Sequence, residues 1–328
     1  MQVRTASGKT APRTTARSRA VLGQLSDIDL RLLRVFKSVA ECGGMAAAEL
    51  ELNIGTSTVS RHVKDLEGRL ALVLCRRGRA GFALTAEGQR VYEETLRLLA
   101  SVDAFRSGID DIHRRLAGPL EIALFDKTAS NPGARIAAAI ARLRDAAPEV
   151  EPSLHVASIN AIERGVIDGR FQLGVIPAHR TSSSLAYTDL FDERMLLYCG
   201  RGHALFGASH AGLTWTKLKA HAFAGLGYHS PNMELSRQAR LVRSATGYDQ
   251  EAIATLVLSG RFLGFLPDHY AEAFERRGLM QPIAPAKFRY ACRFVALMRR
   301  SPPPSRVARL FEQCLIEAHA PTVAASPG

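Results

Sequence analysis

GMAAAELELNIGTSTVSRHVKDLEGR, residues 44–69, is the stretch that decides the fold of the N-terminal region. It predicts a short helix, a tight turn at residues 53–55 and a second helix. Apolar residues of the second helix recur at i, i+4, i+7 and i+11, the spacing of one helical face. They are Val59, Val63, Leu66 and Leu70. The opposite face carries hydroxyl and basic side chains, which suit a helix that lies in the major groove of DNA.

The expected DNA-binding residues of this second helix form one group. They are Thr56, Ser57, Thr58, Ser60, Arg61, His62 and Lys64. Thr56 is also expected to be the N-cap of the helix. Upstream, Ser26 and Asp29 form a capping pair for a preceding helix, which Gly43 and Gly44 should end. The pattern predicts a helix-turn-helix DNA-binding protein.

A short β-hairpin is expected after the helix-turn-helix, at residues 72–84 with a turn at 78–81. Its tip is basic, as in the wing of a winged helix. Arg76, Arg77 and Arg79 could there reach phosphates or a minor groove. A solvated charged loop is the alternative, but the neighbouring helix-turn-helix favours contact with phosphate.

A long helix should then run from the cap Thr85 to about residue 113. Its apolar or near-apolar positions follow steps of four and three, which is a heptad seam. They are Val91, Thr95, Leu98, Val102, Phe105, Ile109 and Ile112. At ~1.5 Å per residue the helix would span roughly 40 Å. One buried face of a globular helix is the alternative, but the regular seam favours a homodimer, which also suits two operator half-sites.

Strands and helices alternate after Gly118 and Pro119. Strands are expected near 120–124, 153–157, 172–176, 195–199, 222–226, 241–244, 262–266 and 293–298. Helices are expected at 132–146, 160–168, 231–240, 249–259 and 305–319. This alternation predicts mostly parallel sheets with ligand sites at the carboxyl ends of the strands. Because about 200 residues are generous for one sheet, two lobes with a cleft are expected.

The composition limits the class of protein. The 328 residues carry a net charge of +12, which favours a polyanionic partner such as double-stranded DNA. The mean hydropathy is -0.02 and no apolar run reaches membrane-spanning length, so no membrane partner is expected. Five scattered cysteines without a CxxC pair predict neither a disulfide framework nor a metal site, and they indicate the cytoplasm. The first 24 residues are basic and resemble a transit peptide in composition, but a disordered basic arm fits them better.

Taken together, these residues resemble the LysR-type transcriptional regulators of bacteria. The resemblance covers residues 26–315 and is strongest in the N-terminal part, at residues 33–36, 39–41, 59–61, 66–67 and 84–88, together with the helix-turn-helix. Further matches are 118–120, 147–150, 201–205 and the pattern Val257-x-x-Gly260-x-x-x-Gly264-x-x-Pro267. It implies an α/β protein with a winged helix-turn-helix, a linker helix and a two-lobed effector domain like type 2 periplasmic binding proteins. Such chains usually form a homotetramer.

The expected domains follow from this resemblance. They are a basic arm (1–25), a winged helix-turn-helix (26–85), a linker and dimerisation helix (86–117), an effector domain (118–316) and a flexible tail (317–328). Lobe I should comprise about 118–192 and 291–316, and lobe II about 193–290. Two departures from the family pattern affect the DNA-binding part. Glu49 replaces a common alanine at the helix crossing, and Thr56 is too short to read adenine as the usual glutamine can.

The expected effector site begins in the loop after the first strand of the effector domain. Ser130 or Asn131 should cap the next helix, whose free N–H groups would attract an anion. The resemblance assigns an effector carboxylate to Thr128 and Ser130, and Lys127 adds charge. A plain helix cap is an equal alternative. The other candidates, from strand-end loops, are Ser158, Tyr228, His229 and Thr246, although a solvated loop position explains His229 equally well.

The leading hypothesis is a transcriptional regulator whose operator binding responds to a small molecule, of the organic acid or amino-acid class. RNA polymerase is a further expected partner. An enzyme or transport-type binding protein with an accessory DNA module is disfavoured, because no G-x-S-x-G, Walker A, HExxH or G-x-G-x-x-G motif is present. No cofactor and no metal are expected. A nucleoid-like protein is disfavoured by the dimer seam and the separate cleft.

Overall fold

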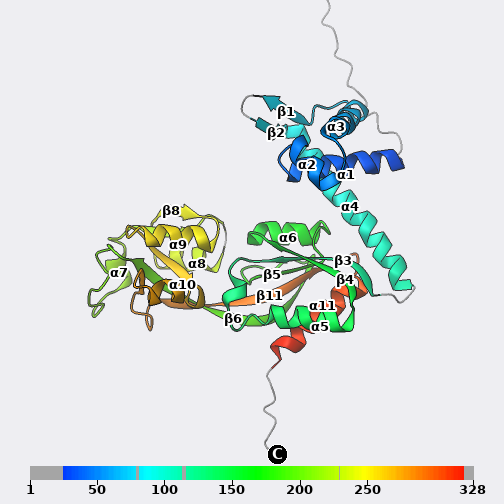
Figure 1. The fold of residues 1–328 in the computed structure, drawn as a ribbon. Helices are drawn as coiled ribbons and strands as arrows, with labels where there is room; N and C mark the ends of the chain where they lie inside the picture. Colours follow the sequence, from blue (N-terminus) through cyan, green and yellow to red (C-terminus); the bar gives the residue numbers. More distant parts are fainter. Residues whose placement is uncertain (1–24, 79–80, 113–115, 229, 321–328) are drawn as a thin grey trace, which may run out of the picture. The chain divides into compact units, whose positions relative to one another are not determined.

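The computed structural model describes residues 25–78, 81–112, 116–228 and 230–320 (Figure 1). Its contacts divide the chain into two compact units, with the boundary between Leu99 and Ala100. The predicted arm up to residue 24, Arg79, His229 and the tail beyond residue 320 lie outside the described residues. None of the described helices is both long enough and apolar enough to cross a membrane.

The first unit is a three-helix core with a two-stranded hairpin. Its elements are α1 (Asp27–Glu41), α2 (Met45–Leu52), α3 (Thr56–Leu70), β1 (Cys75–Gly78), β2 (Gly81–Leu84) and the start of α4 (Ala86–Ile112). The predicted apolar face of α3 is buried, with Val59, Val63 and Leu66 at its centre. Burial of this face against α1 and α2 fixes which side chains of α3 point to solvent.

One ion pair joins α1 to α3 inside this unit. The Arg69 guanidinium donates to the buried Asp29 carboxylate, with Nη2 and Oδ2 2.9 Å apart. The backbone N–H of Ser26 donates to the same carboxylate at 2.9 Å, so the predicted capping pair is confirmed. Hydrogen bonds from Arg69 and then from Ser26 lower the pKa of Asp29 below its ordinary value. Asp29, the acidic member of the capping pair of α1, therefore also anchors α3.

The predicted N-cap of α3 was wrong by one residue. Gly55 is the N-cap and Thr56 is the first helical residue. The Thr56 hydroxyl donates to the Glu49 carboxylate of α2 rather than accepting from its own helix. At the next helix, in contrast, Thr85 caps α4 as predicted, because its Oγ1 accepts from the backbone N–H of Gly88 at 2.8 Å.

The heptad seam of α4 has two different environments. Val91 and Leu98 pack against the winged-helix core of their own chain, and Thr95 is buried. These positions thus contribute to the fold of the first unit. Farther along the helix, 71% of Phe105 and 40% of Ile109 are exposed. The exposed large apolar side chains of the described seam therefore lie in its C-terminal part.

The second unit is an α/β domain. Its strands are β3 (Ala117–Leu124), β4 (Glu149–Val156), β5 (Leu173–Pro177), β6 (Leu185–Gly200), β7 (Phe223–Leu226), β8 (Arg243–Gly247), β9 (Leu263–Pro267), β10 (Met280–Pro282) and β11 (Arg289–Arg299). Its helices are η1 (Thr128–Ser130), α5 (Ile136–Ala146), α6 (Ile159–Ile167), α7 (Trp215–Leu218), α8 (Pro231–Gln238), α9 (Gln250–Leu258), α10 (Asp268–Arg276) and α11 (Arg306–His319).

The strands form one hydrogen-bonded sheet in the order β4-β3-β5-β11-β6-β9-β7-β8, with β10 on β6. The expectation of a mostly parallel sheet holds within each lobe, where β3 pairs in parallel with β4 and β5, and β7 with β8 and β9. It fails at the centre, because β6 and β11 are antiparallel over Leu185–Leu196 and Arg289–Arg299. The predicted lobe boundaries at 192 and 290 fall inside these two strands.

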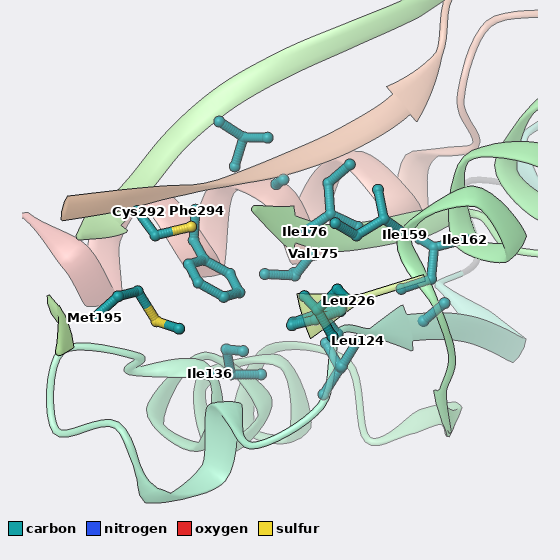
Figure 2. Packing of buried hydrophobic residues seen from close by; sticks show 14 of the residues in the cluster. Leu124, Ile136, Ile159, Ile162, Val175, Ile176, Met195, Leu226, Cys292 and Phe294 are labelled. Atoms are coloured by element: carbon teal, nitrogen blue, oxygen red, sulfur yellow. The ribbon is translucent and has the colours of Figure 1, made fainter. Parts of the chain in front are cut away.

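Helices cover both faces of lobe I, with α6 on one face and α5 and α11 on the other (Figure 1). The core is continuous from one lobe to the other. Figure 2 shows Leu124 of β3, Phe294 of β11 and Leu226 of β7 within one cluster of buried side chains. Because this cluster includes residues of both lobes, it limits how far they can separate without exposing apolar surface.

Two glycine-to-alanine substitutions in the first unit should change stability in opposite directions. A Cβ at Gly88 would lie 2.0 Å from the carbonyl oxygen of Leu74, whereas a Cβ at Gly68 meets no atom within 4 Å. Gly88→Ala should therefore cost about 1–3 kcal/mol. Gly68→Ala should stabilise α3 by roughly 0.5–1 kcal/mol. Urea unfolding of the full-length chain measures both, and a neutral or stabilising Gly88→Ala would contradict the close approach.

Candidate DNA-binding and effector sites

The exposed face of α3 carries three polar side chains in one line. Ser57, Arg61 and Lys64 are exposed and spaced four and three residues apart, so they follow one ridge of the helix. Thr58, Ser60 and His62 are half-buried beside them. The buried face of α3 fixes this ridge toward solvent, where the cations can meet a phosphate backbone or a base edge.

Thr56 lies at the start of α3 but is engaged within the protein. Its hydroxyl donates to Glu49, which is half-buried on α2. The bond gives the Glu49 carboxylate the partner that its position at the helix crossing requires. Thr56 is thus a predicted DNA-binding residue that the structure ties to the helix-turn-helix itself.

The hairpin β1–β2 is anchored to the same core. Cys75 and Phe82 pack against the helix-turn-helix cluster, and the strands pair from Cys75 with Leu84 to Gly78 with Gly81. Arg76 is exposed on β1. The side chains of Arg77 and Arg79 lie outside the described residues. The structure therefore places one of the three predicted basic residues of the hairpin at the surface.

In the effector domain, the loop after β3 does not form the predicted helix cap. The helix expected at 132–146 begins at Ile136, with Arg135 as its N-cap. Asn131 Oδ1 instead accepts from the backbone N–H of Gly133 at 2.8 Å, a local turn that delays the helix. Neither Ser130 nor Asn131 therefore caps α5, so the predicted cap was wrong.

The same loop contacts lobe II. The Lys127 ammonium pairs with the Glu251 carboxylate of α9 and lies 4.6 Å from the ring centroid of Tyr270. Tyr270 donates its hydroxyl to Glu251 at 2.8 Å. Asp126 accepts from the backbone N–H of Gln250 at 2.7 Å. These contacts join the end of β3 to the N-terminus of α9 and the start of α10.

A second group of contacts lies beside them. Ser130 Oγ and His269 Nδ1 are 3.0 Å apart, and His269 Nε2 is 2.9 Å from Glu193 Oε1. Asn131 Nδ2 reaches the same Glu193 oxygen at 3.5 Å. Ser130 and Asn131 belong to lobe I and His269 to α10 of lobe II. Two of the predicted effector residues therefore form contacts between the lobes.

A small cavity of about 10 Å³ lies between the lobes. Phe125, Ile159 and Pro177 line it from lobe I, and Leu226, Asn232 and Gln250 line it from lobe II. Glu193 lines this cavity and also an open groove of about 820 Å³, which Asn131 and His269 border. A cavity of 10 Å³ accommodates about one water molecule. The lobes are thus closed on one another in this structure.

Several buried polar atoms near this cavity have no hydrogen-bond partner among the described residues. They are Asp126 Oδ1, Tyr228 Oη, Asn232 Oδ1 and Gln250 Oε1. Tyr228 was among the predicted effector residues, whereas Asp126, Asn232 and Gln250 were not. Asn232 and Gln250 lie in the first turns of helices that follow β7 and β8, and this position at strand ends was the available signal. Ser158 is half-buried at the N-cap of α6, and Thr246 is exposed on β8.

The buried cysteines show no sign of thiolate activation. Burial raises the pKa of Cys199 to about 11 and also raises the pKa of Cys314 and of Cys292. A thiol with a raised pKa is a poor nucleophile at neutral pH. The described part of the chain also has no cluster of three or more His, Cys, Asp and Glu residues that could hold a metal ion.

A winged helix-turn-helix joined through a long helix to a two-lobed α/β domain with a closed cleft defines a class of protein, the ligand-responsive transcriptional regulators. Family comparisons agree with this class. Residues 30–89 match the bacterial regulatory helix-turn-helix protein, lysR family, and residues 113–320 match the LysR substrate binding domain. The chain belongs to the LysR family of transcriptional regulators.

Two curated relatives agree. The chain is 40% identical over 290 residues to the HTH-type transcriptional activator BauR of Pseudomonas aeruginosa, which covers 88% of this chain and 95% of the relative. It is 31% identical over 200 residues to the SDS degradation transcriptional activation protein of a Pseudomonas species. This alignment covers 60% of this chain and 64% of the relative. The enzyme alternative is thereby set aside, because these relatives are transcriptional regulators.

Solved structures share the fold at low identity. CbnR, a LysR family transcriptional regulator, matches with a TM-score of 0.61 and 17% identity over 89% of this chain and 99% of its own. CbnR complexed with its target DNA matches with a TM-score of 0.59 and 20% identity, covering 88% and 99%. These matches confirm the predicted arrangement of a helix-turn-helix followed by a two-lobed α/β domain.

The buried carboxyl of Asp126 should make stability depend on pH. Burial raises its pKa to about 6, and Asp249 and Glu193 add to the rise against the opposing effects of Gln250 and Lys127. A carboxyl whose pKa is raised by folding binds its proton more tightly in the folded state. The free energy of unfolding should therefore fall as pH rises from about 4 to about 6, and stay lower above that.

The Asp126→Asn variant should not show this fall in the free energy of unfolding with rising pH. Because a rise of about two pKa units corresponds to about 3 kcal/mol, the variant should gain stability over the wild type by roughly that amount between pH 4 and pH 7. Urea unfolding of the effector-domain transition at several pH values measures the difference. Parallel stability profiles for variant and wild type would contradict the raised pKa.

Proposed function

We propose that this chain binds a specific two-fold symmetric operator as a homodimer or homotetramer, and that a small molecule between the lobes modulates this binding. One observation carries the first half: the ridge of Ser57, Arg61 and Lys64, which the buried face of α3 holds toward solvent. Arg61 is the residue expected to read bases, because its planar guanidinium can bind guanine through two hydrogen bonds. Arg76 of the hairpin adds a phosphate contact.

Dimerisation through α4 is the second part of the proposal. An exposed Phe105 and Ile109, four residues apart, form an apolar strip on the second half of the helix. A second copy of α4 would bury this strip, and pairing would place two recognition helices on two half-sites. Val91 and Leu98 support the winged-helix core instead.

Effector control is the third part. The contacts of Lys127 with Glu251 and of Asp126 with Gln250 close lobe I on lobe II, so a molecule that binds between the lobes competes with them. A ligand that favours one lobe arrangement shifts the population of regulator states by its difference in affinity for them. An organic acid or an amino-acid-like metabolite is the proposed class. Both relatives named above are activators, which supports activation through contact with RNA polymerase.

Footprinting on the intergenic DNA upstream of the gene for this chain tests the proposal. With excess competitor DNA at physiological salt, a discrete two-fold symmetric footprint is expected. Diffuse protection that disappears as salt rises would instead indicate nonspecific phosphate binding. A footprint that no cleft ligand alters in length or affinity would contradict the effector part alone.

Arg61→Ala should abolish the specific footprint. Loss of one bidentate base contact costs about 1–3 kcal/mol, or roughly 5- to 150-fold in affinity per half-site. Arg61→Lys keeps the charge but loses the planar fork, so it should lose specificity more than nonspecific affinity. Lys37→Ala removes one positive charge that pairs with Glu41 on α1, and it should retain the footprint. An unchanged operator affinity in Arg61→Ala would refute the role assigned to Arg61.

Phe105→Asp should weaken the dimer. It places a charge in the strip that a second α4 would bury, and an unpaired buried charge is costly. Analytical ultracentrifugation should show dissociation at concentrations where the wild type is assembled, with an unchanged circular dichroism spectrum. Arg106→Asp, at the exposed neighbouring position, also introduces an acid and controls for charge. If both variants assemble like the wild type, α4 is not the interface.

A further inference from the structure

The wall of the cleft that faces lobe I is rich in hydrogen-bond acceptors. Only 3% of Asn232 and 3% of Gln250 is exposed, and the side-chain oxygen of each has no partner among the described residues. Both residues line the cavity between the lobes. A buried carbonyl oxygen without a donor is destabilising, so each of these atoms favours a ligand that donates a hydrogen bond.

The charge around these acceptors is negative. Asp126 Oδ1 is buried and has no partner among the described residues, while Oδ2 accepts from the backbone of Gln250. Asp249 and Glu193 are close enough to raise the pKa of Asp126 further than burial alone does. Burial raises the pKa of Tyr228 and of Tyr270, and Asp126 adds to both rises. The cation next to Asp126 in sequence is Lys127, and it is engaged by Glu251 and by the Tyr270 ring. A buried carboxylate left in this setting favours an incoming cation.

We propose that the effector carries a protonated amine, with Asp126 as its counter-ion and the side-chain oxygens of Asn232 and Gln250 as acceptors. This inference rests on the proposal that the cleft is the effector site. An ammonium group offers three N–H donors and no acceptor, which complements two unpartnered amide oxygens near a carboxylate oxygen that also has no partner among the described residues. A carboxylate at the same position would face Asp126 and be repelled.

The closed cleft adds a mechanical consequence. Its 10 Å³ cavity is too small for an amine with a carbon chain, so the lobes must separate to admit the ligand. Separation breaks the contact of Lys127 with Glu251 and the hydrogen bond from Gln250 to Asp126. Asp126 therefore exchanges a neutral backbone donor for a cationic one, and ligand binding is coupled to the arrangement of the lobes.

Ligand binding to the purified full-length chain tests the proposal. The probes are α- and ω-amino acids of two to six carbons, the unsubstituted carboxylic acids of the same lengths, the n-alkylamines, and Mg²⁺ and Ca²⁺. Thermal shift selects the compounds that stabilise the protein, and calorimetry gives their affinities. At least one amine-bearing compound should bind, and its matched carboxylic acid without the amine should bind at least tenfold more weakly.

Asp126→Asn is the decisive variant. It keeps the shape of the side chain and one acceptor oxygen but removes the charge, so the affinity for the amine should fall roughly 10- to 100-fold. Asp189→Asn is the matched control: it removes the same group from β6 at an exposed position, and it should bind like the wild type. Circular dichroism and the unfolding transition confirm that both variants are folded.

Three outcomes overturn the inference. In the first, the carboxylic acids bind as tightly as the amines and bind Asp126→Asn equally well. In the second, a divalent cation stabilises the wild type but not Asp126→Asn, and no amine binds. In the third, no amine binds at all. In each case the operator footprint and its response to the compounds that do bind are measured separately. A specific footprint that responds to another ligand rejects the amine and keeps the proposed regulator.

Discussion

The antiparallel pairing of β6 with β11 is the constraint on which the effector domain depends. These two long strands run from one lobe into the other, and their ladder extends over Leu185–Leu196 and Arg289–Arg299. Parallel strands of lobe I pair on one side of this ladder and those of lobe II on the other. A backbone ladder resists stretching but can twist and bend, so the lobes can move as bodies while the crossing strands stay paired.

The chemistry of the cleft follows from this connection. Lobe I supplies a carboxylate at the end of β3, and lobe II supplies amide side chains at the starts of α8 and α9. Residues of both lobes line the cavity between them. The closed arrangement buries apolar surface and gives Lys127 and Asp126 partners across the cleft, but it leaves the side-chain oxygens of Asn232 and Gln250 without a partner among the described residues. A ligand that donates hydrogen bonds to these oxygens would give them partners.

The DNA-binding unit depends on more local interactions. Its pattern predicted the buried face of α3, the cap at Thr85 and the pair of Ser26 with Asp29, because periodicity and capping act over three or four residues. Local rules failed where a longer contact intervened. Thr56 has a suitable N-cap side chain, but Glu49, seven residues earlier, takes its hydroxyl. Likewise, the heptad seam of α4 could not reveal that Val91 and Leu98 pack on their own domain.

The class of fold, the order of its elements and the exposed face of α3 can all be predicted from the residue pattern. Those features follow from patterns that repeat within each element. The tertiary structure alone decided which polar groups meet in the cleft. Asp126 and Gln250 are 124 residues apart, and His269 meets Glu193 across 76 residues. Such contacts depend on the crossing strands and on lobe closure, and no local periodicity records them. For the same reason, burial of Asp126, and with it the charge of the site, became visible only in the folded chain.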